Sequence, residues 1–249
     1  MLFDVFPIQL QSDNDDLPSS VEEVVKIIKY VENIISHCLC IYDYETNRIL
    51  YISENLNYFY RVFIDYERSN AYYECVDSDE RLFLKKIHKA YRRQFKTISS
   101  AGENQFIFSY DTVVRAERSA LIFKITQFPL VITKNGLPRI ILLSIIPSPV
   151  KEREEPVMYR YNDKLYYRYT LLNDRWEKMN VPFLTDNEFK VILFSAQGYS
   201  EVEIAEKMYK SHDSIRSYKR AIYKKVGVNS INAAIPFLIC NKWLLMKEV

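Results

Sequence analysis

The spacing of apolar residues changes along the chain, and each change predicts a different element. Between residues 21 and 35, apolar side chains recur every three or four positions, which predicts an amphipathic helix. Its narrow apolar stripe suits either a short coiled-coil contact or packing on the helix's own domain. Residues 38–53 are rich in β-branched and aromatic residues on both sides of a polar turn, which predicts a β-hairpin.

A second helix and three further strands are predicted beyond this hairpin. Residues 77–95 combine an acidic start with helical spacing of apolar positions. Strand-like runs follow at 105–110, 120–133 and 138–146, and a Lys-Asn-Gly turn at 134–136 separates the last two. The pattern predicts an α+β fold: an N-terminal antiparallel five-stranded sheet with helices, followed by a separate all-helical region.

The order of these elements resembles a PAS domain over residues 36–147. The sequence CVDSDE at 75–80 is similar to the acidic turn that precedes the long helix in many PAS domains. The resemblance implies a sensory or dimerising domain with helices on one face of its five-stranded sheet. A small organic ligand is a candidate occupant, because 14 Phe and 20 Tyr allow an apolar cavity. The same residues equally allow a filled core that only mediates dimerisation.

A linker and a Tyr-rich segment follow the predicted sheet. The run PSPVKEREEP at 147–156 combines prolines with charges, which is typical of a linker. The next run, MYRYNDKLYYRYTLL, predicts a hairpin that turns at Asn162-Asp163. The predicted organisation is therefore an arm and amphipathic helix, a PAS-like domain, a linker with the Tyr-rich hairpin, and a helical domain, at residues 1–35, 36–147, 148–180 and 181–249.

The helical region contains repeated start and stop signals. A Ser or Thr that precedes Glu by three positions predicts a capping box, and a glycine after an apolar stripe predicts a left-handed helix end. These signals are Thr185 with Glu188, Ser200 with Glu203, a third cap at Ser211, and the glycines Gly198 and Gly227.

Three capped helices with a tight turn between the second and the third predict a helix-turn-helix. Ala205 is small enough to let these two helices cross closely. The third helix, residues 212–226, is predicted to direct Ile215, Ile222 and Val226 inward. A fourth helix follows and completes an all-helical domain of four helices. Pro236 is expected to kink this last helix.

The third helix is also where positive charge concentrates. The whole chain has a net charge of only +2, yet residues 207–225 hold seven basic side chains and one acid, Asp213. Such a run alone fits a solvated helix face. Its coincidence with the third helix of a helix-turn-helix favours a polyanionic partner, most simply double-stranded DNA. The side chains predicted to point outward are Arg216, Lys219, Arg220 and Lys224.

These residues resemble the LuxR-type (NarL/FixJ-like) DNA-binding domain. The matching runs are LTDNE, AQGYSEVEIAEKM and SHDSIRSYKRAIYKKVGV, which begin at Leu184, Ala196 and Ser211 and align without gaps. The resemblance implies a sequence-specific DNA-binding transcriptional regulator whose recognition helix, residues 212–226, enters the major groove. The chain departs from the family pattern at several positions, which include Asn187, Glu201, Val202, Lys210, Tyr218 and Ala221.

Carried over position by position, the resemblance implies a set of site residues. Base contacts are expected from Arg216, Ser217 and Arg220. Phosphate contacts are expected from Ser211, Ser214, Lys219, Tyr223, Lys224 and Lys225. The helix-turn-helix scaffold is expected to depend on Thr185, Glu188, Gly198, Ser200, Glu203, Ala205 and Gly227.

The predicted partners follow from this assignment. Two-fold binding to DNA would multiply the small affinity of one helix-turn-helix, so we expect a homodimer. The helix at 21–35, the PAS-like sheet and the last helix each offer a contact for it. RNA polymerase is a second candidate partner. The alternative function is a sigma-factor-like or protein-docking helix-turn-helix protein, whose basic helix binds the transcription machinery rather than an operator.

Composition argues against the common classes of enzyme. Four scattered Gly and three His cannot supply a Walker loop, a GxGxxG turn or an HExxH zinc motif, and the four Cys contain no CxxC pair. We therefore expect no catalytic activity, no cofactor and no metal. His88 is expected to be a surface or core residue rather than a haem ligand. Cys38 and Cys40 share one face of a strand, as buried core residues or a redox pair.

The ends and the apolar runs of the chain predict its location. The start lacks the basic segment of a signal peptide, and the most apolar run, residues 140–146, is far shorter than the ~20 residues that cross a bilayer. We expect a cytoplasmic protein with no membrane partner.

Overall fold

The computed structural model divides the chain into two compact units, residues 1–179 and 180–249. None of the helices it describes has the length and apolar character that a membrane crossing requires. The described residues are 8–9, 19–35, 37–46, 48–55, 76–99, 106–116, 119–148, 150, 152–160 and 163–240.

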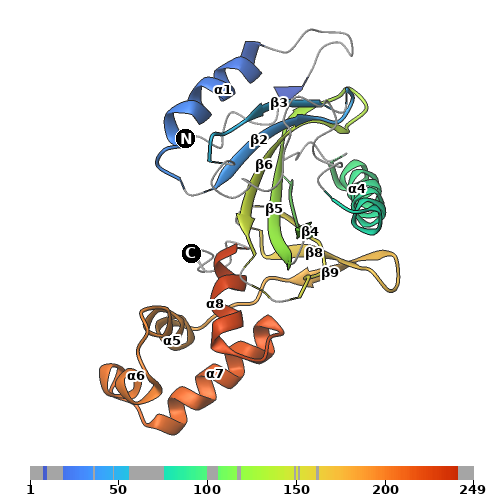
Figure 1. Ribbon diagram of the computed structural model, residues 1–249. Coiled ribbons are helices and arrows are strands. Elements are labelled where there is room, and N and C mark those ends of the chain that lie inside the picture. The colour runs from blue at the N-terminus through green and yellow to red at the C-terminus, as the bar shows by residue number, and fades with distance from the viewer. Residues whose placement is uncertain are drawn as a thin grey trace. The chain divides into compact units, whose positions relative to one another are not determined.

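The first unit is built on one large sheet (Figure 1). All five predicted strands are present, and they lie side by side in the order β3-β2-β6-β5-β4 with antiparallel pairing throughout. Their bounds are Cys38–Asp43 for β2, Arg48–Ile52 for β3, Phe106–Ala116 for β4, Ser119–Ile132 for β5 and Pro138–Pro147 for β6.

The sheet is larger than the five strands predicted. Strand β7 (Val157–Arg160) pairs with β4, and β8 (Leu165–Thr170) and β9 (Arg175–Asn180) continue beyond it. The short strand β1 (Ile8–Gln9) pairs in parallel with β5, so the described residues contribute nine strands to the sheet. The Tyr-rich segment does form a hairpin, β7–β8, although Asn162 of its predicted turn lies outside the described residues. The sequence predicted the hairpin of β7 and β8 but not the sheet that it joins, and it did not predict β1 or β9.

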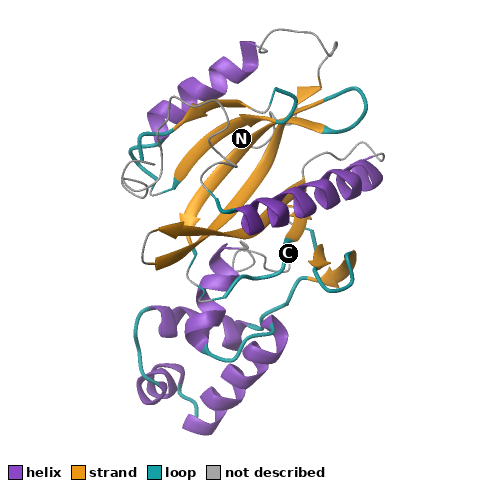
Figure 2. Ribbon diagram, turned by 45° about the vertical axis from the view of Figure 1, so that its right-hand side comes forward, coloured by secondary structure: helices purple, strands orange, loops and turns teal. Residues whose placement is uncertain are grey.

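A helix covers each face of the sheet (Figure 1): α4 (Ser78–Ser99), from the predicted PAS-like region, lies on one face, and α1 (Ser19–Val31), from the segment before that region, covers the other. Helix α1 packs Val21, Val24 and Ile28 against one face. Helix α4 packs against the other, as Figure 2 also shows. Strand β2 is therefore buried along its whole length: its alternate residues face α1 and α4 in turn.

The stripe of α1 settles one of the two interpretations of that helix. Val21, Val24 and Ile28 are nearly inaccessible because they contact Leu39 and Ile41 of β2. The helix thus packs on its own domain, and its stripe is not available for a coiled coil.

Part of the segment predicted as a linker is bound to the sheet. The Glu154 carboxylate lies 2.7 Å from the Lys124 ammonium of β5. Arg153 pairs with Glu80 at the start of α4, and its guanidinium lies 3.8 Å from the centre of the Phe83 ring. Residues 153–154 therefore belong to the packed first unit, because their charged ends find buried partners there.

Up to residue 240, where the described part of the chain ends, the second unit contains the four predicted helices (Figure 2). Their core residues Ile192, Ile204, Ile215, Ile222, Ala234 and Leu238 are completely buried. Helix α8 contains Pro236 and still continues to Cys240, so the proline does not end it. The bounds are Asp186–Ala196 for α5, Glu201–Met208 for α6, His212–Val226 for α7 and Ile231–Cys240 for α8.

Candidate nucleic-acid interface

The first two helices of the second unit begin with the predicted capping boxes. Thr185 Oγ1 accepts a hydrogen bond from the Glu188 amide, and Glu188 Oε2 accepts one from the Thr185 amide at 2.7 Å. Ser200 and Glu203 form the same reciprocal pair at the start of α6. Gly198 has a φ of +87°, the left-handed conformation predicted for it. These local bonds fix where α5 ends and where α6 begins.

The turn between α6 and α7 is tight because its backbone closes on itself. The Lys210 amide donates to the Ala205 carbonyl at 2.9 Å, and Tyr209 adopts a left-handed conformation with a φ of 52°. Ser211 then caps α7, as predicted. Ala205 is 7% exposed, which agrees with its predicted place between crossing helices. The left-handed Tyr209 was not predicted, since glycine or asparagine usually occupies such a position.

Helix α7 presents one face to its domain and another to solvent. Ile215, Ile222 and Val226 face the domain core, as predicted. Gly227 ends the helix with a φ of +78°. The three predicted base-contact residues are all exposed, and they lie along one side of the helix within five positions: Arg216, Ser217 and Arg220. The structure therefore brings this part of the predicted site together on an accessible surface.

The residues predicted to contact phosphates differ in how accessible they are and in what they already bind. Lys224 is exposed, whereas Lys219 is only 9% exposed, so its predicted outward orientation is wrong. Lys225 Nζ donates to Glu188 Oε2 at 2.6 Å, which ties α7 to α5. Tyr223 is half-buried, and burial raises the pKa of its hydroxyl. Of the serines, Ser211 accepts from the Ser214 amide at 3.2 Å at the first turn of α7.

Glu201 in the first turn of α6 is the centre of a charge cluster that the sequence did not reveal. Its carboxylate accepts from Lys219 Nζ at 3.1 Å and from Arg216 Nε at 3.4 Å, and it lies 3.2 Å from His212 Nε2. The hydrogen bond from Lys219 lowers the pKa of Glu201, so the carboxylate is ionised at neutral pH. These partners are 11 to 18 positions away in another helix, so only the fold brings them together.

Two of the departures from the family pattern contact each other. Asn187 Nδ2 donates a hydrogen bond to Tyr218 Oη at 3.2 Å. This bond joins α5 to α7, so the two changed residues contribute to the same helix–helix contact.

The core of the first unit contains a cluster of polar side chains between α4 and the sheet. His88 Nε2 and Tyr110 Oη are 2.9 Å apart, and Tyr44 Oη donates to Gln127 Oε1 at 2.9 Å. Burial lowers the pKa of His88 to about 3, so the ring is neutral at physiological pH. His88 is therefore a core residue, which is one of the two positions predicted for it.

Two polar atoms of this core have no hydrogen-bond partner among the described residues. They are Tyr91 Oη and Gln127 Nε2, and both residues are fully buried. Tyr91 stacks on Phe108 with ring centres 4.6 Å apart, and Phe108 lies opposite Gln127 in the β4–β5 register. A buried polar group left unpaired costs about 1–3 kcal/mol, so each of these two atoms would gain from a polar partner.

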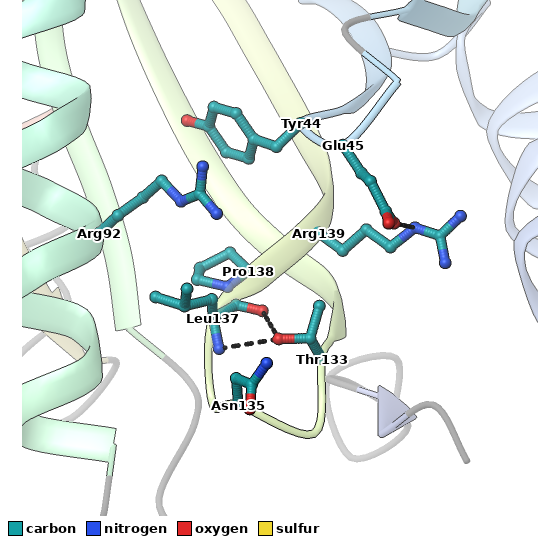
Figure 3. A pocket seen from close by; sticks show the side chains of 8 residues that line it. All are labelled: Tyr44, Glu45, Arg92, Thr133, Asn135, Leu137, Pro138 and Arg139. Carbon is teal, nitrogen blue, oxygen red and sulfur yellow. Dashed lines mark hydrogen bonds and ion pairs between the residues drawn. The ribbon is translucent and has the colours of Figure 1, made fainter. Parts of the chain in front are cut away.

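A polar pocket of about 280 Å³ opens at one end of the sheet (Figure 3). Arg92 reaches it from α4, with its guanidinium 5.5 Å from the centre of the Tyr44 ring. The guanidinium of Arg139 is held at Glu45, with 2.7 Å between Nε and Oε2. The full lining is Tyr44, Glu45, Arg92, Thr133, Asn135, Leu137, Pro138 and Arg139.

The two cysteines of β2 are buried and not bonded to each other. Burial raises the pKa of Cys38 to about 11 and raises that of Cys40 further. Both are therefore thiols at neutral pH, which favours core residues over a redox pair. In the described part of the chain, His, Cys, Asp and Glu side chains form no group of three or more that suits a metal ion.

Comparison with known families identifies the second unit. Residues 182–238 match the family model described as bacterial regulatory proteins, luxR family. The match covers α5, α6, α7 and most of α8. No curated protein sequence matches the chain.

Several solved structures have weak similarity to the whole chain. The phage VqmA–DPO complex shares 13% identity at a TM-score of 0.33 and covers 92% of this chain and 90% of its own. The Vibrio cholerae VqmA–ligand–DNA complex shares 12% at 0.29, covering 91% and 92%. A Vibrio cholerae VqmA dimer without target DNA shares 12% at 0.28, covering 88% and 86%. Similarity at this level does not establish a common fold.

Proposed function

We propose that this chain, whose residues 182–238 form a LuxR-type helix-turn-helix domain, is a sequence-specific DNA-binding transcriptional regulator. The observation that carries the proposal is the match of a regulator family to a segment whose third helix exposes Arg216, Ser217 and Arg220. In this proposal the chain acts by binding DNA, and its DNA-binding domain spans residues 181–249.

In this proposal α7 lies in the major groove of double-stranded DNA. Arg216, Ser217 and Arg220 face base edges, where an arginine can bond bidentately to guanine. Ser211, Ser214, Tyr223 and Lys224 flank them and approach phosphates, which fix the register of the helix on the duplex. Lys219 and Lys225 reach DNA only if they leave Glu201 and Glu188.

The alternative of a sigma-factor-like or protein-docking helix is less well supported. The family model extends through α7 into α8, and it describes regulatory proteins. A docking surface for the transcription machinery would leave unexplained why the exposed residues of α7 include two arginines on one side with serine between them.

We propose a homodimer as the DNA-binding form. One helix-turn-helix contacts few phosphates, and non-specific affinities are only ~10⁻⁴–10⁻⁶ M. Two copies on half-sites about 34–36 Å apart would multiply that affinity. The dimer contact is proposed among the elements that the sequence nominated, with the stripe of α1 removed from that set because it is buried within its own unit.

The first unit is proposed to be a PAS-like sensory domain. The strand order β3-β2-β6-β5-β4, with α4 packed across it, supports this reading, and β7–β9 are an extension of the sheet. The unpaired Tyr91 Oη and Gln127 Nε2 support a small organic ligand with at least one hydrogen-bonding group. Their burial beside an aromatic core favours a ligand that is polar at one end and apolar elsewhere.

The proposal is tested with the purified full-length chain and a pool of random genomic fragments, titrated across a salt series. We expect affinity that falls steeply with salt, and enrichment of a subset of fragments that share a two-fold repeat. Absence of salt-dependent binding would refute the DNA-binding function and turn attention to a protein partner. Binding without enrichment would refute the sequence-specific part alone.

A further inference from the structure

Glu201 places a negative charge within the surface that is proposed to contact DNA. It lies at the first turn of α6 and contacts Arg216 and Lys219, two of the residues that the sequence assigned to DNA. The side chain of Glu201 is 32% exposed, and that of Arg216 is 55% exposed. A phosphate that approaches Arg216 therefore also approaches the carboxylate of Glu201.

The cluster changes what the basic stripe offers to DNA. Lys219 Nζ and Arg216 Nε both donate hydrogen bonds to the Glu201 carboxylate, and His212 Nε2 lies 3.2 Å from it. Non-specific binding depends almost entirely on cations that neutralise phosphates. Because Glu201 pairs with two of these cations, they are less available to phosphates, and non-specific binding to DNA is weaker.

Specific binding is affected less, because it has another source of free energy. On an operator, Arg216 can leave Glu201 and form hydrogen bonds with a base edge, which compensates for the lost contact. On random DNA no such bond replaces it, and the repulsion between Glu201 and the phosphates remains.

We propose that Glu201 is a specificity-determining residue that weakens binding to non-operator DNA more than binding to the operator. This inference rests on the proposed DNA-binding function. It assigns Glu201 a role in that function, which it performs by pairing with Arg216 and Lys219. A purely structural role differs in its consequences. If Glu201 only stabilised the start of α6 and the buried stem of Lys219, its removal would lower thermal stability without raising affinity for DNA.

The test compares full-length Glu201→Gln with the wild type on two duplexes: one of random sequence, and one enriched by the wild type from genomic fragments. Gln keeps the size of the side chain and removes the charge. Glu206→Gln is the matched control, because Glu206 is exposed on the same helix and carries the same charge. Fluorescence anisotropy across a salt series gives both affinities, and circular dichroism melting verifies the fold.

We expect Glu201→Gln to bind the random duplex about 3- to 10-fold more tightly at low salt, as expected for removing one charge near phosphates. Its salt dependence should steepen by about one released counterion. Affinity for the enriched duplex should rise by a smaller factor, so the specificity ratio falls. Glu206→Gln should stay within about twofold of the wild type on both duplexes, because Glu206 lies five positions after Glu201, on a different side of α6, and an exposed charge is screened.

A folded Glu201→Gln that binds the random duplex no more tightly than the wild type would overturn the inference, while the proposed function would stand. An equal gain on both duplexes would likewise overturn the specificity role. Failure of the wild type to bind either duplex would instead refute the proposed function. Glu201→Asn, which also removes the charge, provides a second variant that should behave as Glu201→Gln does if the latter folds poorly.

Discussion

The Lys124 ammonium lies 3.2 Å from the Asp111 carboxylate, and both side chains are almost fully buried, with exposures of 4% and 0%. Burial alone would lower the pKa of Lys124, but the carboxylates of Asp111 and Glu154 outweigh burial and raise it. The Lys124 ammonium is therefore charged inside the first unit. Asp111 also accepts from Ser148 Oγ and from the Glu154 amide, so the pair holds the segment after β6 against the sheet.

Removing one member of this pair should destabilise the first unit strongly. We expect Lys124→Met to lower the free energy of unfolding by about 3–5 kcal/mol, because Asp111 is left as a buried charge without its main partner. Lys85→Met, at an exposed lysine of α4, is the control and should change it by less than about 0.5 kcal/mol. Urea unfolding of the full-length chain measures both. A loss below about 1 kcal/mol for Lys124→Met would show that the pair contributes little.

Elements that depend on neighbouring residues were predictable from the sequence. The capping boxes of Thr185 and Ser200 and the left-handed Gly198 each involve bonds or angles within four positions. The inward register of α7 followed from Ile215 and Ile222, which lie two helical turns apart and are both completely buried. Local patterns therefore predicted the helix on which the structure exposes Arg216, Ser217 and Arg220 together.

Features that depend on distant partners were not predictable. Lys219 lies in a helical run of charges that looks solvated, yet it turns to Glu201 of the preceding helix. Lys124 lies in a strand where a charged residue predicts a solvent-facing position, and Glu154 from a segment 30 positions later covers it. In both cases a charge is buried because another charge from a different element meets it, and no periodicity encodes such a pairing.

The buried His88 should make the stability of the first unit depend on pH. Its pKa is about 3 in the folded chain against 6.5 for an unperturbed histidine, so below pH 6.5 the unfolded chain binds a proton that the folded chain does not. Stability contributed by the neutral ring is thus lost as the pH falls from 6.5 toward 3, by up to about 1.4 kcal/mol per pH unit.

The change that tests this is His88→Gln, which removes the titrating ring. The difference in unfolding free energy between wild type and variant should shrink as the pH falls from about 6.5 to 4, because only the wild type pays to keep His88 neutral. Urea unfolding in a Trp243→Phe background isolates the fluorescence of Trp176, which packs against Phe108 of the first unit. Parallel pH dependences for the two proteins would contradict the assignment of a neutral buried ring.

Tyr209 should be a site where a single substitution stabilises the second unit. A left-handed conformation costs a non-glycine residue roughly 1–2 kcal/mol, and the side chain of Tyr209 is 95% exposed, so it returns little packing. We expect Tyr209→Gly to raise the free energy of unfolding by about 0.5–1 kcal/mol after the entropy cost of glycine. Lys210→Gly, one position later in the same turn, should not stabilise. Thermal unfolding followed by circular dichroism measures both, and a less stable Tyr209→Gly would refute the strain.

Arg216 and Lys224 should separate base recognition from phosphate contact. Both are exposed cations on α7, but only Arg216 lies among the residues proposed to face base edges. We expect Arg216→Ala to cost about 1–3 kcal/mol on an enriched operator and to relax the preference at one base pair of each half-site. Lys224→Ala should instead weaken binding to operator and random DNA alike and reduce the salt slope by about one charge. The measurement is anisotropy titration of the full-length variants on the operator, on single-base-pair changes of it, and on random DNA. An equal loss for Arg216→Ala on all of these duplexes would reject base contact and make Arg216 another phosphate ligand.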